Sequence, residues 1–181
     1  MLMSFLDNLI EVGKWDTKPE LLDALSGCSE GSLLLGEDSE YPKAFYSATV
    51  WIGTLRAGLR QFGVGICEEI GLRPHLLALP DAGLLIFGFN DETVGVSLQE
   101  KRELFRLSLG TPFRSFASLP DADMILVFSE IGVVAVTKHG QELWRYDEDI
   151  IEECVIDGDT LRFKFMDSPP ASIGLLDGRP R

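Results

Sequence analysis

A stretch of the chain repeats itself at a distance of forty residues, and this repeat limits the folds that are open to it. Residues 79–82 read Leu-Pro-Asp-Ala, and residues 119–122 read the same. Three more blocks match in the same order. Residues 84–87 align with 124–127, residues 94–97 align with 134–137, and residues 103–106 align with 142–145 after one deleted residue. Four blocks that match in one order indicate that a structural unit is repeated.

The repeated unit has the pattern of four short strands. From about residue 72 the apolar residues follow a period of two, and turn residues interrupt them at regular intervals. A third copy begins at residues 155–159 and continues through 161–165 and 173–176. A four-stranded unit of about forty residues has the size of one β-propeller blade. We therefore expect residues 72–178 to form antiparallel strands in three successive units.

One turn of the unit carries an aspartate in every copy, at Asp81, Asp121 and Asp157. Aspartate favours tight turns because its carboxylate accepts backbone hydrogen bonds. The sequence therefore predicts three structurally equivalent turns, and this structural role accounts for all three carboxylates.

The second copy resembles the blade repeat of quinoprotein-like β-propellers. In that repeat a strand ends in Ala-x-Asp, the chain turns through a glycine, and a tryptophan follows four residues later. Ala135, Gly140 and Trp144 match this pattern, whereas Thr137 stands in place of the aspartate. The first copy has Phe105 in the position of Trp144 and lacks the turn glycine. The resemblance implies that these two aromatic residues dock one blade on the next and are largely buried, and it implies nothing about binding a quinone.

Residues 43–70 allow two interpretations. Five apolar residues advance by four, three, four and three positions, a spacing typical of an amphipathic helix: Ala48, Ile52, Leu55, Leu59 and Phe62. Residues 50–54 and 58–62 instead resemble the Trp-Ile-Gly-Thr hairpins of sensor-regulator propellers. We favour strands, which bring the chain to nearly four partial blades.

Residues 1–30 have the features of two helices. Ser4 can cap a first helix, because the apolar residues after it recur at helical spacing. A second helix begins after Thr17, which forms a capping box with Glu20, and it ends at Gly27.

The predicted fold class is therefore mainly β with N-terminal helices (α+β). Residues 1–30 form the helical segment, and residues 31–181 form a single β-repeat domain, a twisted antiparallel meander of propeller-blade-like repeats. Four partial blades are too few for a typical propeller, so a β-sandwich or an open barrel is the alternative. About the last 60 residues also resemble the tails of uncharacterised bacterial proteins, a similarity that implies no activity.

The charge balance limits the partners. The chain carries 16 basic and 29 acidic side chains, a net charge of −13. Such a surface repels polyanions, which argues against nucleic acid and anionic membranes. The acidity is explained by solubility, and attraction to a basic protein partner is the alternative. Three cysteines without a Cys-x-x-Cys pair, and an N-terminus without the features of a signal peptide, predict a cytoplasmic protein.

No complete catalytic or ligand-binding motif is present in the sequence. Residues 63–68 begin like a dinucleotide fingerprint, but Glu68 stands where the third glycine is required. His75 and His139 do not have the spacing of a structural zinc site, and we expect both to face solvent. Residues 157–159 offer too few oxygens for calcium. The sequence therefore predicts no catalytic residue, no cofactor and no metal site.

Residues 147–159 form the candidate partner-binding strip. They hold seven acidic residues and no basic one, with isoleucines and a valine between them. Two interpretations remain: a solvated loop that leads into an edge strand, and a docking strip for a cationic surface with apolar anchors. The residues predicted to bind the partner are Asp147, Glu148, Asp149, Ile150, Ile151, Glu152 and Glu153.

Three functions are compatible with these features. The first is a non-catalytic protein-interaction module with an acidic surface, for example an immunity-type inhibitor of a basic bacterial toxin. The second is a hydrolase whose site is built from Asp and Glu residues in the turns. The third is a β-repeat protein that assembles with copies of itself.

Overall fold

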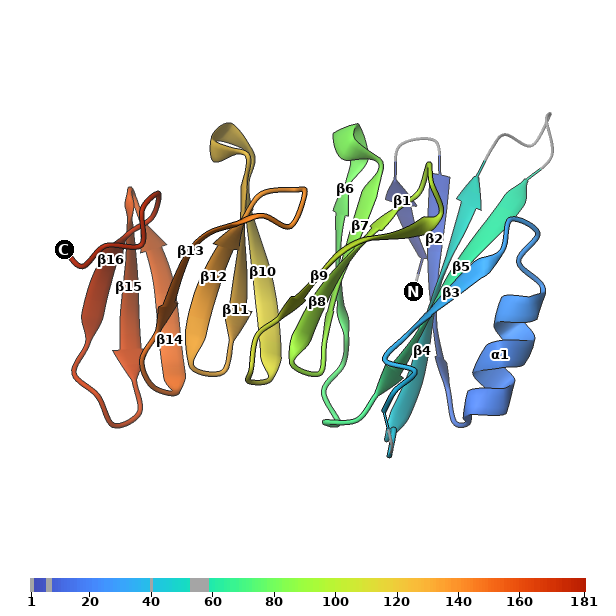
Figure 1. Ribbon diagram of the computed structural model, residues 1–181, viewed down its shortest axis with the longest axis horizontal. Coiled ribbons are helices and arrows are strands. Elements are labelled where there is room, and N and C mark those ends of the chain that lie inside the picture. Colours follow the sequence, from blue (N-terminus) through green and yellow to red (C-terminus); the bar gives the residue numbers. More distant parts are fainter. Residues whose placement is uncertain (1, 6–7, 40, 53–58) are drawn as a thin grey trace.

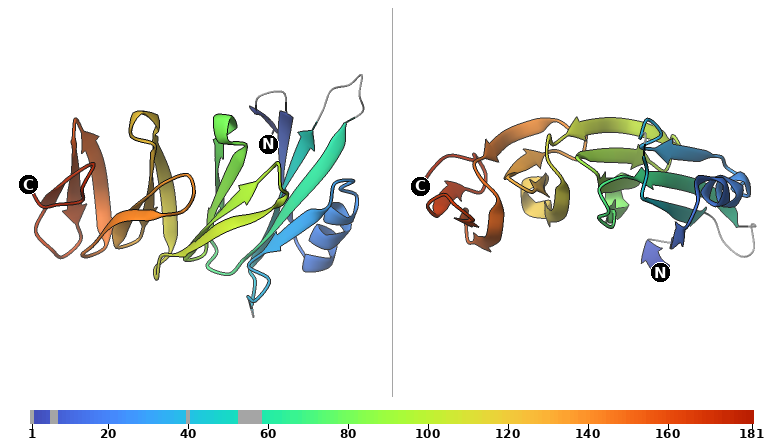
Figure 2. Two further views of the ribbon diagram at one scale, coloured as in Figure 1. Left: turned by 45° about the horizontal axis from the view of Figure 1, so that its top comes forward. Right: turned by 90° about the horizontal axis from the view of Figure 1, so that it is seen from below.

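The chain folds into four sheets placed side by side in a row (Figures 1 and 2). The computed structural model describes residues 2–5, 8–39, 41–52 and 59–181, and of residues 2–5, 8 and 121 it describes only the backbone. Helix α1 (Lys18–Ser26) lies at one end of the row, next to sheet 1. Sheet 4 lies at the opposite end, so the row is open and does not close into a ring.

Sheet 1 has the order β1-β2-β4-β5-β3, and the other sheets are antiparallel meanders in chain order. The strands of sheet 1 are β1 (Leu2–Phe5), β2 (Asn8–Trp15), β3 (Ser32–Leu35), β4 (Ala44–Ile52) and β5 (Arg60–Glu68). The strands of sheet 2 are β6 (His75–Leu79), β7 (Leu84–Phe89), β8 (Glu92–Ser97) and β9 (Arg102–Ser108). The strands of sheet 3 are β10 (Phe113–Leu119), β11 (Met124–Ser129), β12 (Gly132–Val136) and β13 (Glu142–Asp147). The strands of sheet 4 are β14 (Ile151–Asp157), β15 (Thr160–Phe165) and β16 (Ala171–Gly174).

The three antiparallel units predicted from the repeat are sheets 2, 3 and 4. In sheets 2 and 3 the Leu-Pro-Asp-Ala turn forms a short 3₁₀ helix, followed by a left-handed residue, Gly83 or Asp123. The third turn occupies the same place between the first and second strands of its sheet. It is a tighter hairpin, because Asp157 pairs directly with Thr160. The predicted equivalence therefore holds for the first two turns, and the third differs in conformation.

The first predicted N-terminal helix is wrong, because strands β1 and β2 occupy that segment. Strand β2 pairs antiparallel with β4, and this places Ile10 in the core between sheets 1 and 2. The second helix is confirmed as α1. Its capping box is complete: the Glu20 backbone N–H donates to Thr17 Oγ1 at 3.4 Å, and the Thr17 N–H donates to Glu20 Oε2 at 3.1 Å. The predicted division of the chain into an N-terminal segment, residues 1–30, and a β-repeat domain, residues 31–181, stays a prediction.

The described part of residues 43–70 forms strands β4 and β5, as favoured, and the helical interpretation is wrong there. Strand β4 pairs antiparallel with β5, whereas residues 53–58, on which part of both interpretations falls, lie outside the described residues. Helix α1 packs on β5, and there Gly63 and Gly65 have a packing role. A Cβ atom at either glycine would lie 2.7 Å from a methyl carbon of Leu25. These glycines therefore permit the close approach of the helix, which explains the start of the apparent dinucleotide fingerprint.

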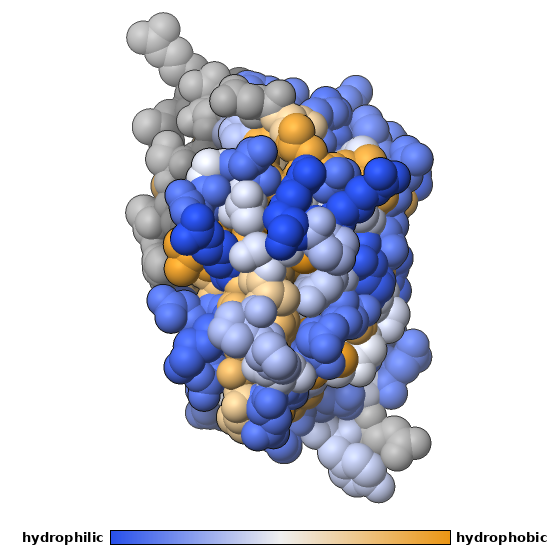
Figure 3. Space-filling view, turned by 90° about the vertical axis from the view of Figure 1, so that its left-hand side faces the viewer, coloured by the Kyte–Doolittle hydropathy of each residue, from blue (hydrophilic) through white to orange (hydrophobic). Residues whose placement is uncertain are grey.

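Three apolar layers hold the four sheets together. Strand β7 contributes to two of them, because Leu85 and Phe87 face sheet 1 while Leu84 and Ile86 face sheet 3. At one end of the row, α1 covers sheet 1 with Leu21 and Leu25. At the other end, the outer surface of sheet 4 carries the ion pairs Arg162–Asp157 and Lys164–Glu152. Figure 3 views this end and shows hydrophilic side chains around smaller apolar areas. No helix among the described residues is long and apolar enough to cross a membrane.

An aromatic side chain of one sheet packs on a left-handed glycine of the next. Phe105 of sheet 2 contacts Gly140 of sheet 3, where a Cβ would lie 2.2 Å from Phe105 Cγ. Trp144 of sheet 3 contacts Gly178 beyond β16, where a Cβ would lie 2.7 Å from the indole. The two aromatic residues have equivalent partners, since Phe105 pairs with Gly95 and Trp144 with Ala135. The predicted burial is confirmed for Trp144, whereas Phe105 is only half-buried.

The repeated Glu-Leu-Phe-Arg and Glu-Leu-Trp-Arg segments contain a β-bulge. In sheet 2 the register shifts between Gly95 and Val96, which leaves Leu104 as the extra residue. Residues three apart in a regular strand point to opposite faces, and one extra residue brings them to the same side. Glu103 can therefore pair with Arg106 at 2.7 Å. Sheet 3 repeats this arrangement, with Glu142 and Arg145 paired at 2.9 Å.

We expect Gly140→Ala to destabilise the protein more than Gly110→Ala. Both glycines have a left-handed φ, +77° and +74°, but a Cβ at Gly110 would meet nothing within 4 Å. Gly110→Ala should therefore lower the free energy of unfolding by about 1–2 kcal/mol, the conformational term alone. Gly140→Ala should lower it by at least about 1 kcal/mol more, because the new methyl group collides with Phe105. Urea unfolding measures both, and equal losses would contradict tight docking of Phe105.

Candidate functional site

An acidic hollow of about 390 Å³ lies where sheets 1 and 2 meet. Its walls come from residues 36–39 after β3, Glu69 after β5, Asn90 and Asp91 between β7 and β8, Glu92 at the start of β8, and Arg106 on β9. Five carboxylates line it, against one arginine: Glu37, Asp38, Glu69, Asp91 and Glu92. The hollow therefore has an excess of negative charge.

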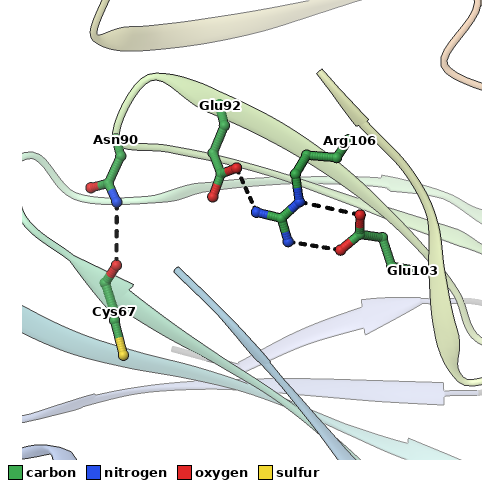
Figure 4. Close-up of polar contacts among 5 residues, drawn as sticks. All are labelled: Cys67, Asn90, Glu92, Glu103 and Arg106. Atoms are coloured by element: carbon green, nitrogen blue, oxygen red, sulfur yellow. Dashed lines mark hydrogen bonds and ion pairs between the residues drawn. The ribbon is translucent and has the colours of Figure 1, made fainter. Parts of the chain in front are cut away.

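The Asn90 side chain forms hydrogen bonds between sheet 2 and the end of sheet 1 at the hollow. Its side-chain amide nitrogen donates to the Cys67 carbonyl at 3.3 Å, and its Oδ1 accepts from the Glu69 backbone N–H at 2.9 Å. Figure 4 shows the first of these bonds. Asn90 has a left-handed φ of 47°, a conformation that asparagine tolerates better than most residues. The turn between β7 and β8 is thus held against the end of β5, which fixes two walls of the hollow.

Arg106 forms the cationic wall and is shared between two carboxylates (Figure 4). Its Nη2 lies 2.7 Å from Glu103, and its Nη1 lies 2.5 Å from Glu92. Burial raises the pKa of Glu92, and the hydrogen bond from Arg106 opposes this shift. Glu103 and Glu92 together raise the pKa of Arg106, so the guanidinium remains charged. Because these two carboxylates already hold Arg106, it neutralises little of the remaining charge.

The other carboxylates of the hollow lie nearer the solvent. Glu37, Asp38, Glu69 and Asp91 are exposed. Glu37 lies 4.0 Å from the Lys18 ammonium, and Glu69 accepts a hydrogen bond from the Ser39 hydroxyl at 2.7 Å. Exposed carboxylates whose neighbours share their charge attract a cation from solution.

Glu68 precedes the lining residue Glu69 and has a structural role. Its side chain is fully buried, and Oε1 accepts from the backbone N–H groups of Ile70, Gly71 and Leu72 at 2.7, 2.7 and 3.1 Å. A carboxylate with three such donors satisfies the backbone of a turn. Glu68 therefore shapes the loop after β5 and does not line the hollow.

Residues 147–153, the part of the strip predicted to bind the partner, do not form one exposed surface. Some of their side chains lie in the core, some hold a turn and some face solvent. Ile151 is buried in the layer between sheets 3 and 4, so it is not available as a surface anchor, and Ile150 is half-buried. Glu152 is paired with Lys164 at 2.5 Å. Glu148 and Glu153 are exposed. The role of the strip in partner binding stays a prediction.

Two acidic residues of the strip have perturbed pKa values. Asp149 accepts backbone hydrogen bonds from Ile150, Asp167 and Ser168, and these bonds lower its pKa. Asp149 thereby ties the start of sheet 4 to the loop after β15. Burial raises the pKa of Asp147, which lies opposite Gly132 in the sheet.

The nucleophilic and metal-binding side chains lie apart from one another. Burial raises the pKa of all three cysteine thiols, that of Cys154 to about 11. His75 and His139 are exposed, as predicted. In the part of the chain that the structure describes, no group of three or more His, Cys, Asp or Glu side chains is arranged to hold a metal ion.

Sequence reasoning missed the hollow because its walls are distant along the chain. One signal was present in the sequence: pairs of adjacent acidic residues lie at or just after the ends of β3, β5 and β7, at positions 37–38, 68–69 and 91–92. Placing them together requires the packing of sheet 1 on sheet 2, which the repeat in residues 79–145 does not include.

Distant structural similarity links the chain to β-propeller proteins of known structure. For the CNH domain of AfRom2 the TM-score is 0.47 at 12% identity, over 76% of this chain and 46% of that one. For KlHsv2 with loop 6CD replaced by a Gly-Ser linker it is 0.45 at 10% identity, over 77% and 48%. For BamB from Moraxella catarrhalis it is 0.43 at 10% identity, over 78% and 44%. No family model and no curated protein matches the sequence.

The chain spans less than half the length of each of these three proteins. The predicted fold class is confirmed by the sheets themselves: the protein is mainly β, with one short N-terminal helix among its described residues, and sheets 2 and 3 are four-stranded antiparallel meanders like the blades of a propeller. These blade-like sheets do not close into a ring.

We expect Asp149→Ala to lower the melting temperature at pH 7, because two backbone N–H groups lose their acceptor. The folded pKa of Asp149 is lowered, so its stabilisation is complete above the unfolded pKa of about 3.9 and is lost as the pH falls further. The difference from the wild type should therefore shrink below about pH 4. Glu153→Ala is the control, since among the described residues Glu153 accepts no hydrogen bond. Scanning calorimetry from pH 3 to 7 measures both, and a pH-independent difference would contradict the role of the ionised carboxylate.

Proposed function

We propose that this chain is a non-catalytic protein-binding module whose acidic hollow receives a basic side chain of a cationic protein partner. The observation that supports the proposal is the gathering of five carboxylates from three separate segments in one concavity. A lysine or arginine of the partner would relieve the repulsion among these groups on binding. The net charge of −13 would accelerate the encounter with such a partner.

The state of Glu92 favours binding over hydrolysis. A carboxylate hydrolase needs an acid whose pKa is raised and whose proton is free to reach the substrate. Burial does raise the pKa of Glu92, but one of its oxygens lies 2.5 Å from Arg106. Such an ion pair favours the ionised form, which has no proton to donate. We therefore place the hydrolase second.

A partner of different sequence is favoured over a second copy of the chain. Helix α1 covers the outer face of sheet 1, and ion pairs lie on the outer surface of sheet 4. Among the described residues, neither end of the row offers a large apolar face of the kind that stable homodimers bury. An immunity-type inhibitor of a basic bacterial toxin in the cytoplasm is the specific form of the proposal, and the strip at residues 147–153 would add a second acidic contact.

Charge-neutralising variants at three places test the proposal. The hollow variant is Glu37→Gln, Asp38→Asn and Asp91→Asn, and the strip variant is Glu148→Gln, Glu152→Gln and Glu153→Gln. A scattered control, Asp16→Asn, Asp23→Asn and Asp81→Asn, changes the net charge by the same amount. The probes are ten-residue oligo-lysine and oligo-arginine peptides, followed by cationic proteins captured from the host.

We expect the hollow variant to slow association about three- to tenfold and to flatten its salt dependence, because steering depends on charge near the site. The scattered control should have a much smaller effect. Stopped-flow fluorescence at several salt concentrations measures the association rates. Equal slowing in all three variants would mean that only the net charge matters and would overturn the proposal. Slowing by the strip variant alone would move the site to residues 147–153.

A further inference from the structure

A second cavity, of about 400 Å³, lies beside the free edge of sheet 2 and differs from the hollow in character. It is lined by side chains of β2, β4, β5, β6, β7 and β10, so that sheets 1, 2 and 3 all contribute. Most of the lining is apolar, with Ala48 and Phe87 from buried positions and Leu76 and Phe116 from half-buried ones. Cavities that hold small ligands have this size and composition.

Arg73 gives this cavity a cationic rim. It is exposed, and it belongs to the cavity lining. Most of the described lysine and arginine side chains pair with a carboxylate, but Lys14, Arg73 and Arg179 have neither an ion pair nor a side-chain hydrogen bond among the described residues. Lys14 lies over the Tyr46 ring, 5.9 Å from its centroid, and does not belong to the cavity lining. In a chain with 29 acidic residues, an arginine that has no carboxylate partner and borders an apolar cavity is free to bind an external anion.

The neighbours of Arg73 are compatible with an anion. His75, Tyr46 and Ser115 supply polar side chains to the lining, and among the described residues no carboxylate belongs to it. The His75 ring packs edge-on against Phe113, with 5.5 Å between the ring centroids. Burial and the nearby Arg73 lower the pKa of His75, so at neutral pH Arg73 is the charged group.

We propose that this cavity binds a small organic anion with an apolar body, such as an aromatic or aliphatic carboxylate or sulfonate. The guanidinium of Arg73 pairs with the anionic group, and the apolar body lies against Leu76, Phe87 and Phe116. The cavity volume suits one small molecule, and the charge of the rim selects an anion over a neutral compound. This site is independent of the acidic hollow, because it has the opposite charge and shares no lining residue with it.

Two fluorescent probes that differ in charge test this site. 1-Anilinonaphthalene-8-sulfonate carries a sulfonate, whereas N-phenyl-1-naphthylamine has the same apolar body without the charge. We expect Arg73→Gln to weaken binding of the sulfonate about tenfold and to leave binding of the neutral amine unchanged. Arg179→Gln is the matched control, because it removes a second arginine that has no partner among the described residues and that lies outside the cavity lining. It should change neither affinity.

The position of the bound probe is checked by NMR, since the chain has only two histidines. Saturation with the sulfonate should shift the imidazole signals of His75 and leave those of His139 in place, and His139→Gln assigns the two sets. Equal loss of sulfonate binding in Arg73→Gln and Arg179→Gln would overturn the proposal, and so would an unshifted His75. Equal loss of both probes in Arg73→Gln would mean that Arg73 supports the shape of the cavity and does not select an anion.

Discussion

The burial of both faces of a sheet is the constraint on which the rest of this structure depends. Strand β7 is buried along its whole length, and alternate side chains enter two different apolar layers. Strand β11 behaves in the same way, with Leu126 facing sheet 4 and Val127 facing sheet 2. A sheet with two apolar faces is unstable with only one neighbour, because several large side chains would remain in water. The sheets therefore stack in a row. At each end of the row the outermost sheet needs an outer face that is either covered or polar, unlike the apolar faces inside the row.

The sequence predicts the inner sheets well because their evidence is local. A period of two, a repeated turn and a repeated aromatic residue together determine the strands of sheets 2 and 3. The N-terminal segment was mispredicted because the residues around Ile10 fit a helical spacing as well as a strand. Pairing with β4, more than thirty residues away, decides between the two, and no local pattern records it. The parallel strand β3 was missed for the same reason, since its partner β5 follows it at a distance.

The two candidate sites show a corresponding limit. The acidic strip is contiguous and therefore visible in the sequence, but folding places Ile151 in the core and uses Asp149 to hold a loop. The hollow and the apolar cavity are assembled from strand ends and edges that meet only after the sheets pack. Charge counting gave the sign of the surface. It could not show where the carboxylates of the hollow gather. Nor could it show that Arg73 borders the apolar cavity without a carboxylate partner among the described residues.

Both cavities border sheet 1, at the junction where the repeat is broken. At the junctions of sheet 2 with 3 and of sheet 3 with 4, an aromatic ring packs on a left-handed glycine of the next sheet. The residue of sheet 2 that corresponds to Gly140 is Lys101, also left-handed, and its ammonium pairs with Glu30 of the segment between α1 and β3. An ion pair between long side chains joins two sheets without bringing their backbones into contact. The acidic hollow and the apolar cavity both border this junction, where an ion pair stands in place of the aromatic contact.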